Sequence, residues 1–184
     1  MKKFLLTVVF TASAVLFSAD AKLTVADYSF SDKTHTASGG DPGFKKLTDG
    51  KINADGKKER YGRVLFRHIE NKRVPVKITF NFKNAVKISE AKIHYYRWTN
   101  SYGIKDIKLV GIKSDNSRFP MGSVTLNHPY TKPKSDPFNM SAVIKAGNST
   151  PVKSVQLIFT ATGGYLSLNE IEFSGDETKP AATK

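Results

Sequence analysis

The 184-residue chain contains no cysteine. It therefore has no disulfide bond, no thiol nucleophile and no cysteine metal ligand, and it cannot carry a thiol-linked lipid anchor. The composition includes only one tryptophan. An exported chain without disulfides depends for its stability on its apolar core or on a bound ion.

Motifs for catalysis are also absent. The sequence has neither a Gly-x-Ser-x-Gly nucleophile elbow nor a His-Glu-x-x-His metal motif. No pair of carboxylates occurs in a setting that would separate their pKa values for acid–base chemistry. We therefore expect a binding protein and not an enzyme, with an uncharacterised hydrolase as the open alternative.

Long apolar runs are scarce, and the one near the N-terminus has the features of a signal peptide. Phe4–Phe17 follows two lysines, is too short to span a bilayer comfortably and leads to the Ala-x-Ala motif Ala19-Asp20-Ala21. We expect cleavage after Ala21, which removes residues 1–21. The mature chain is then secreted or periplasmic, and no later segment predicts a membrane span.

Basic residues outnumber acidic ones, 29 to 16, for a formal net charge of +13. Without residues 1–21 the counts are 27 and 15, and the net charge is +12. Such a field favours polyanions, which include acidic or sulfated polysaccharides, teichoic acid, lipopolysaccharide and nucleic acid. Export argues against nucleic acid as the partner. A second explanation, that the charge serves solubility alone, stays open.

Most of the remaining chain predicts β-strands, because apolar and polar residues alternate with a period of two. The main candidates are Val76–Phe82, Ile88–Trp98, Ile104–Ile112, Val143–Lys145, Val152–Thr160 and Tyr165–Phe173. A turn is expected at Asn84, and only Ser123–Leu126 is expected as strand within the proline-rich stretch Arg118–Asn139. No segment shows a sustained helical stripe. We predict one all-β antiparallel sandwich over residues 22–175, followed by a disordered tail, residues 176–184.

Four stretches occur in an order that resembles a known family. They are Leu47-Thr48-Asp49-Gly50, the strand Val76–Phe82, the strand Ile88–Arg97 and the closing segment Leu166–Gly175. Together they resemble the galactose-binding-like jelly roll, also called the discoidin or coagulation factor five/eight type C (F5/8 type C) domain. The sequence departs from the family at Asn81-Phe82-Lys83, where Asp-Leu-Gly is usual, and at Tyr61, where a tryptophan is common. The missing disulfide makes the bacterial carbohydrate-binding branch the closer match.

This resemblance implies a structural Ca²⁺ beside the Asp-Gly loop. By position, the carboxylates of Asp49 and Glu170 would bind it, with backbone carbonyls near Lys46, Lys51 and Asn169. The residues themselves agree in part, because a carboxylate placed among apolar strand residues requires a partner. In the alternative, Asp49 only caps a turn and Glu170 pairs with a lysine.

The family's sugar site lies on loops at one end of the sandwich. An aromatic face stacks on the sugar there, and Arg, Asn or His side chains hydrogen-bond its hydroxyls. The candidates are Arg97, Trp98, Asn100 and Tyr102 in one loop, Tyr61, Arg63 and His68 in a second cluster, and Tyr165. Trp98 has the alternative role of capping the core.

We therefore expect an exported, non-catalytic carbohydrate-binding module with a structural calcium ion. The positive charge makes an acidic glycan one option for the ligand. The alternative is an envelope- or protein-binding adhesion module driven by that charge.

Overall fold

The computed structural model describes residues 20–30, 35–38, 41, 44–52, 64–68, 74–97, 102–127, 138–148 and 150–178. The strands in these ranges are β1 (Ala21–Lys22), β2 (Val25–Phe30), β3 (His35–Ser38), β4 (Val64–His68), β5 (Val76–Arg97), β6 (Ile104–Ile112), β7 (Arg118–Thr125), β8 (Phe138–Lys145), β9 (Val152–Ala161) and β10 (Tyr165–Glu177). Every pairing between them is antiparallel. The predicted all-β fold is confirmed. In the same ranges no helix is long and apolar enough to cross a bilayer.

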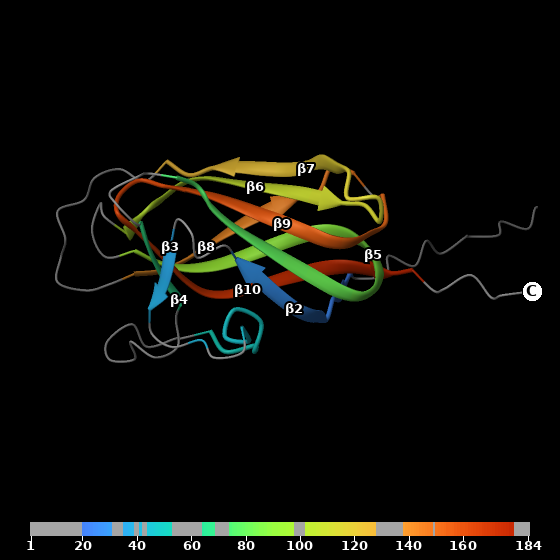
Figure 1. Cartoon of the computed structure of the whole chain (residues 1–184), viewed down its shortest axis with the longest axis horizontal. Helices are drawn as coiled ribbons and strands as arrows, with labels where there is room; N and C mark the ends of the chain where they lie inside the picture. The colour runs from blue at the N-terminus through green and yellow to red at the C-terminus, as the bar shows by residue number, and fades with distance from the viewer. Residues whose placement is uncertain are drawn as a thin grey trace, which may run out of the picture.

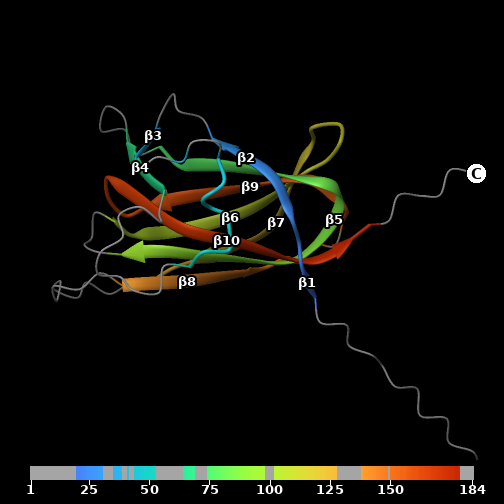
Figure 2. The same ribbon diagram turned by 90° about the horizontal axis from the view of Figure 1, so that it is seen from below.

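The strand β5 is 22 residues long, and its two halves belong to different layers. Its first half pairs with β9 on one side and β2 on the other. Its second half pairs with β10 and β8. β6 and β7 extend the first layer beyond β9, while β4 and β3 extend the second beyond β10. Figures 1 and 2 show β5 curving from one layer into the other.

The turn predicted at Asn84 is therefore wrong. Asn84 lies within β5, and the register shifts between Asn81 and Val86 where the strand passes between layers. At this bend Lys83 is exposed, and Asn84 and Ala85 are half-buried. A turn at the surface has the same exposure and therefore the same polar composition. Their composition alone does not distinguish a bend from a chain reversal.

Two further segments contain more strand than predicted. β7 begins at Arg118, ahead of the predicted Ser123, and β8 begins at Phe138. Pro120 is tolerated in β7 because it sits beside a register shift, on the strand that ends the sheet order. β10 also continues through Glu177, two residues past the expected domain end at Gly175.

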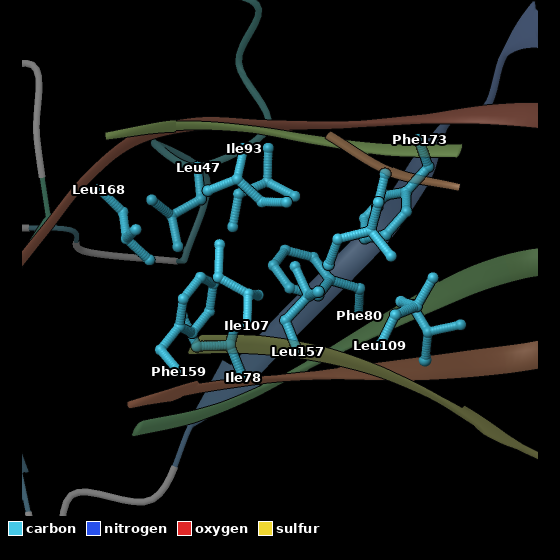
Figure 3. Packing of buried hydrophobic residues seen from close by; sticks show 14 of the residues in the cluster. Leu47, Ile78, Phe80, Ile93, Ile107, Leu109, Leu157, Phe159, Leu168 and Phe173 are labelled. Carbon is cyan, nitrogen blue, oxygen red and sulfur yellow. The ribbon is translucent and has the colours of Figure 1, made fainter. Parts of the chain in front are cut away.

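The core lies between the two layers and is rich in aromatic rings. Phe173 of β10 contacts Phe80 and Phe82 of β5 edge-to-face, with ring centroids 5.2 and 5.6 Å apart. Leu47, from the loop of residues 44–52, is fully buried in the same cluster, as Figure 3 shows. One loop residue is thus part of the core that the strands build.

Gly175 is required where β10 passes β5. Its φ is +153°, and a Cβ built there would lie 2.0 Å from the carbonyl oxygen of Lys87. We expect Gly175→Ala to lower the free energy of unfolding by about 2 kcal/mol or more, because backbone must move to make room. Gly164→Ala is the matched control, since no atom lies within 4 Å of its added Cβ. Urea unfolding of both variants tests this, and equal stabilities would refute it.

Candidate functional site

The loop of residues 44–52 is attached to the last strand of the sandwich. The amide of Ile171 donates to the carbonyl of Leu47 over 2.7 Å. The amide of Leu47 donates to the hydroxyl of Tyr28 over 3.3 Å. Together with the buried Leu47 side chain, these bonds place the Asp49-Gly50 turn directly against β10.

Glu170 of β10 is fully buried beneath this loop. Its Oε1 accepts the Gly50 amide over 3.0 Å, and Gly50 adopts a φ of +78°. Its Oε2 is buried without a hydrogen-bond partner. Burial raises the pKa of Glu170 to about 7, and the nearby negative charge of Asp49 acts in the same direction. A buried carboxylate with an unpartnered oxygen is stabilised by binding a cation or by taking up a proton.

Asp49 is exposed, and one of its carboxylate oxygens accepts a hydrogen bond within its own turn. Its Oδ1 accepts the amide of Lys51 over 2.9 Å, which is the turn-capping role that the sequence allowed. The two acidic residues therefore approach each other from opposite ends of the sequence. In the described ranges no group of three or more His, Cys, Asp or Glu side chains forms a metal cluster. An ion at this place would need backbone carbonyls as further ligands.

The other predicted calcium ligands lie in the same two segments. Lys46 and Lys51 belong to the loop, and Asn169 precedes Glu170 at a register shift of β10. The side chain of Asn169 is buried and donates to Oδ1 of Asn139 over 3.1 Å. The predicted calcium ligand is the backbone carbonyl of Asn169 and not this side chain.

The alternative that Glu170 pairs with a lysine named no residue, and Lys22, whose charge acts on Glu170, is bonded to a neighbouring carboxylate. Lys22 Nζ lies 2.8 Å from Glu172 Oε1, and His94 Nε2 lies 3.2 Å from Glu172 Oε2. These bonds lower the pKa of Glu172, the Lys22 contact most strongly. Glu172 is thus neutralised by its neighbours, whereas the described partners of Glu170 include no such ion pair.

A second group of candidate residues gathers at one end of the sandwich. The rings of Tyr102 and Tyr165 are stacked, with centroids 4.8 Å apart and an interplanar angle of 12°. Tyr102 directly precedes the Gly103–Ile104 entry to β6, and Tyr165 begins β10. The amide of Thr162 donates to the carbonyl of Gly103 over 2.9 Å, which ties the two loops together.

Two arginines lie at strand ends, and one of them is opposite a tyrosine of this pair in the strand register. Arg67 of β4 is exposed and stands directly opposite Tyr165. Arg97 is the last residue of β5 and is half-buried. His68 follows Arg67 and pairs in the backbone with His35 of β3. The strand ends that carry these residues meet on the left of Figures 1 and 2.

The remaining sugar-site candidates lie outside the described residues. They are Tyr61, Arg63, Trp98 and Asn100.

Sequence reasoning missed one exposed aromatic, Phe44. Its side chain is 42% exposed, and it packs beside Tyr28 in the loop that carries Asp49. Asp41-Pro42-Gly43 is a recognisable turn sequence. Nothing in that sequence indicates that the following phenylalanine stays at the surface.

Comparison with known proteins finds matches among solved structures but not among sequences. No family model matches the chain, and a search of curated proteins finds no match. A CBM32 module of AlyQ, solved with 4,5-unsaturated mannuronic acid, is 12% identical with a TM-score of 0.52; the match covers 83% of this chain and 97% of that one. This chain shares the β-sandwich fold of that module.

Two further structures share this fold. The C-terminal domain of a chitobiase from Bacteroides fragilis is 13% identical with a TM-score of 0.53, and the match covers 86% of this chain and 100% of that one. CBM32 domains of ZmpB from Clostridium perfringens, solved with GalNAc, are 12% identical with a TM-score of 0.55, covering 84% of this chain and 35% of that one. The fold predicted from the four sequence stretches is confirmed.

The buried Glu170 predicts an unusual dependence of stability on pH. Its pKa is about 7 in the folded chain and 4.5 as the reference value, so the unfolded state loses this proton first. In chelator, the contribution of Glu170 to stability should therefore fall as pH rises from about 4.5 to about 7, by on the order of 3 kcal/mol. Glu170→Gln should abolish that contribution in urea titrations across this range.

Glu172→Gln is the control with the opposite sign. The pKa of Glu172 is lowered, so its contribution is present above its unfolded pKa and disappears as the pH falls. If Glu170→Gln leaves the pH profile unchanged, the buried carboxylate is not the cause.

Proposed function

We propose that this protein is a non-catalytic carbohydrate-binding module that recognises a glycan at the loop end of the sandwich. The observation that carries the proposal is the stacked pair Tyr102–Tyr165, with Arg67 opposite Tyr165 in the strand register and Arg97 at the end of β5. Structures of the same fold, solved with a mannuronic acid derivative and with GalNAc, support it.

The two tyrosines and the arginines have the chemistry needed to bind a sugar ring. An aromatic face packs on the C–H surface of a pyranose, and a guanidinium group hydrogen-bonds hydroxyl or carboxylate oxygens. Stacking one tyrosine on the other restricts both rings before a ligand arrives, so less side-chain entropy is lost on binding. The bond between Thr162 and Gly103 holds the two supporting loops in register.

The charge of the chain favours an acidic glycan as the ligand. The net charge of residues 22–184 is +12. A field of this sign raises the association rate of a polyanion, while close contacts such as an arginine fork determine selectivity. The signal-peptide pattern of residues 1–21 further supports a secreted or periplasmic protein, where such glycans are encountered.

We also propose one structural Ca²⁺ between the Asp-Gly loop and β10. The unpartnered Oε2 of Glu170 and the carboxylate of Asp49 would bind it, together with backbone carbonyls near Lys46, Lys51 and Asn169. Oxygen-only ligands are what Ca²⁺ prefers. The ion would supply the positive charge that the buried carboxylate otherwise lacks, and its role would be structural.

Sugar binding is tested by calorimetric titration with galactose, GalNAc and a hexuronate oligomer. We expect Tyr165→Ala to weaken binding about tenfold or more, equivalent to about 1.4 kcal/mol, with little change in melting temperature. Tyr165→Phe should retain most affinity because the stacked ring remains. Trp98→Ala tests the adjoining loop in the same way.

The proposed site is wrong if wild type binds sugar and none of these substitutions alters the affinity. Binding that requires only the lysines and disappears in salt would indicate a charge-driven adhesion module instead.

Calcium is tested by thermal unfolding with and without a chelator. An ion bound to the folded state alone adds about 2.7 kcal/mol at a hundredfold excess over Kd, so chelation should lower the melting temperature by several degrees. Glu170→Gln and Asp49→Asn should abolish this response, whereas Glu172→Gln should preserve it. An unchanged wild-type melt in chelator would contradict the calcium proposal.

A further inference from the structure

Phe44 combines two features that are rarely found together. Its side chain is 42% exposed, one of the few large apolar groups at the surface in the described ranges. Its φ is 51°, in the left-handed region that bulky side chains seldom adopt. A glycine or asparagine would satisfy this turn at lower conformational cost. An exposed aromatic residue held in a disfavoured backbone conformation points to a function.

The backbone around Phe44 is fixed by one carboxylate. Oδ1 of Asp41 accepts the amides of Lys45 and Lys46 over 3.0 and 3.1 Å, and Oδ2 accepts the hydroxyl of Tyr28. The amide of Phe44 donates to the carbonyl of Asp41 over 3.2 Å. These hydrogen bonds hold the backbone of residues 44–46 against Asp41.

The ring of Phe44 is also supported from below. It packs edge-to-face against Phe30, with centroids 5.2 Å apart, and against Tyr28 at 5.9 Å. Phe30 in turn contacts Phe66 of the core at 4.9 Å. These contacts orient Phe44 but do not bury it, so the exposed part of the ring is presented to a ligand on a fixed support.

The loop that carries this ring is basic in sequence, since residues 44–52 include three lysines and one aspartate. Lys45 and Lys51 are exposed in the same loop. The carboxylates of Asp41 and Asp49 both accept hydrogen bonds from the loop itself. An exposed aromatic ring on a basic loop suits a pyranose that carries a carboxylate or sulfate, because an aromatic face packs on the C–H face of a sugar and lysines attract its charge.

We propose that Phe44, with Lys45 and Lys51, forms a second glycan-binding site for acidic sugars. This inference rests on the proposed carbohydrate-binding function and goes beyond it. The loop of residues 44–52 lies under β2 and β10 in Figure 1, and the ring of Phe44 contacts Tyr28 and Phe30 of β2, whereas Tyr165 pairs in register with Arg67 of β4. Two weak sites on one polysaccharide chain would raise its apparent affinity through effective concentration.

The test uses the exported chain, a hexuronate oligomer, GalNAc and an immobilised polyuronate. Wild type should bind about two oligomers per chain, and Phe44→Leu should bind one, because leucine keeps the apolar bulk without an aromatic face. Phe44→Leu should also weaken binding to the polymer about tenfold or more. Phe44→Tyr should restore both, and equal melting temperatures of the three proteins exclude unfolding as the cause.

Tyr165→Ala separates this inference from the proposed function. The Phe44 site is rejected if wild type binds a single oligomer, or binds only GalNAc, and this binding is removed by Tyr165→Ala but not by Phe44→Leu. The loop-end site stands in that case. If only Phe44→Leu removes binding, the loop-end site is rejected and the Phe44 site stands. Absence of all sugar binding rejects both. Phe44-dependent binding to phosphatidylglycerol vesicles without uronate binding would reject the glycan assignment.

Discussion

Both layers of the sandwich depend on the hydrogen bonding of β5. The strand pairs with β2 and β9 through its first half and with β8 and β10 through its second. In each layer, β5 therefore has a neighbouring strand on both edges. Its backbone N–H and C=O groups form hydrogen bonds with these neighbours, and its apolar side chains face the core. This register also decides which strand ends meet, since the end of β5 and the start of β10 fall at the same end of the molecule.

A second constraint comes from the buried carboxylate of Glu170. A negative charge without a counter-ion is costly in an apolar interior, and the fold can relieve it by a proton or by a cation. The contact also joins residues 120 positions apart, from Gly50 to Glu170. Because closing so long a segment restricts most of the chain, a cation at this point would provide the cross-link that a cysteine-free domain otherwise lacks.

The two proposed ligand surfaces share one physical feature. Tyr102 and Tyr165 hold each other by stacking, and Phe44 is held by Tyr28, Phe30 and the turn at Asp41. In each case an aromatic ring is immobilised before a ligand binds. Weak sugar contacts gain most from this arrangement, because little side-chain entropy remains to be lost.

The local pattern of residues was enough to predict the fold class and the strands with clean alternation, such as β6 and β9, because a period of two is a local property of the chain. It did not reveal the passage of β5 through Asn84, since polar residues mark an exposed bend and a turn alike. The extent of β8 was missed because Asn139, Ser141 and Ala142 carry little β-propensity, and pairing with β5 overrides it.

The candidate sites divide in the same way. Asp49 and Glu170 were identifiable from sequence through the resemblance of their motifs, but the unpartnered Oε2 and its raised pKa follow only from the burial that loop and strand create together. The stacking of Tyr102 on Tyr165 depends on β6 and β10 entering the sandwich at one end. The hydrogen bonds of Asp41 that accompany the positive φ of Phe44 are local, but the ring contacts of Phe44 with Tyr28 and Phe30 require that the loop pack against β2. Such features belong to the tertiary structure, since each requires contacts between residues that the chain order keeps apart.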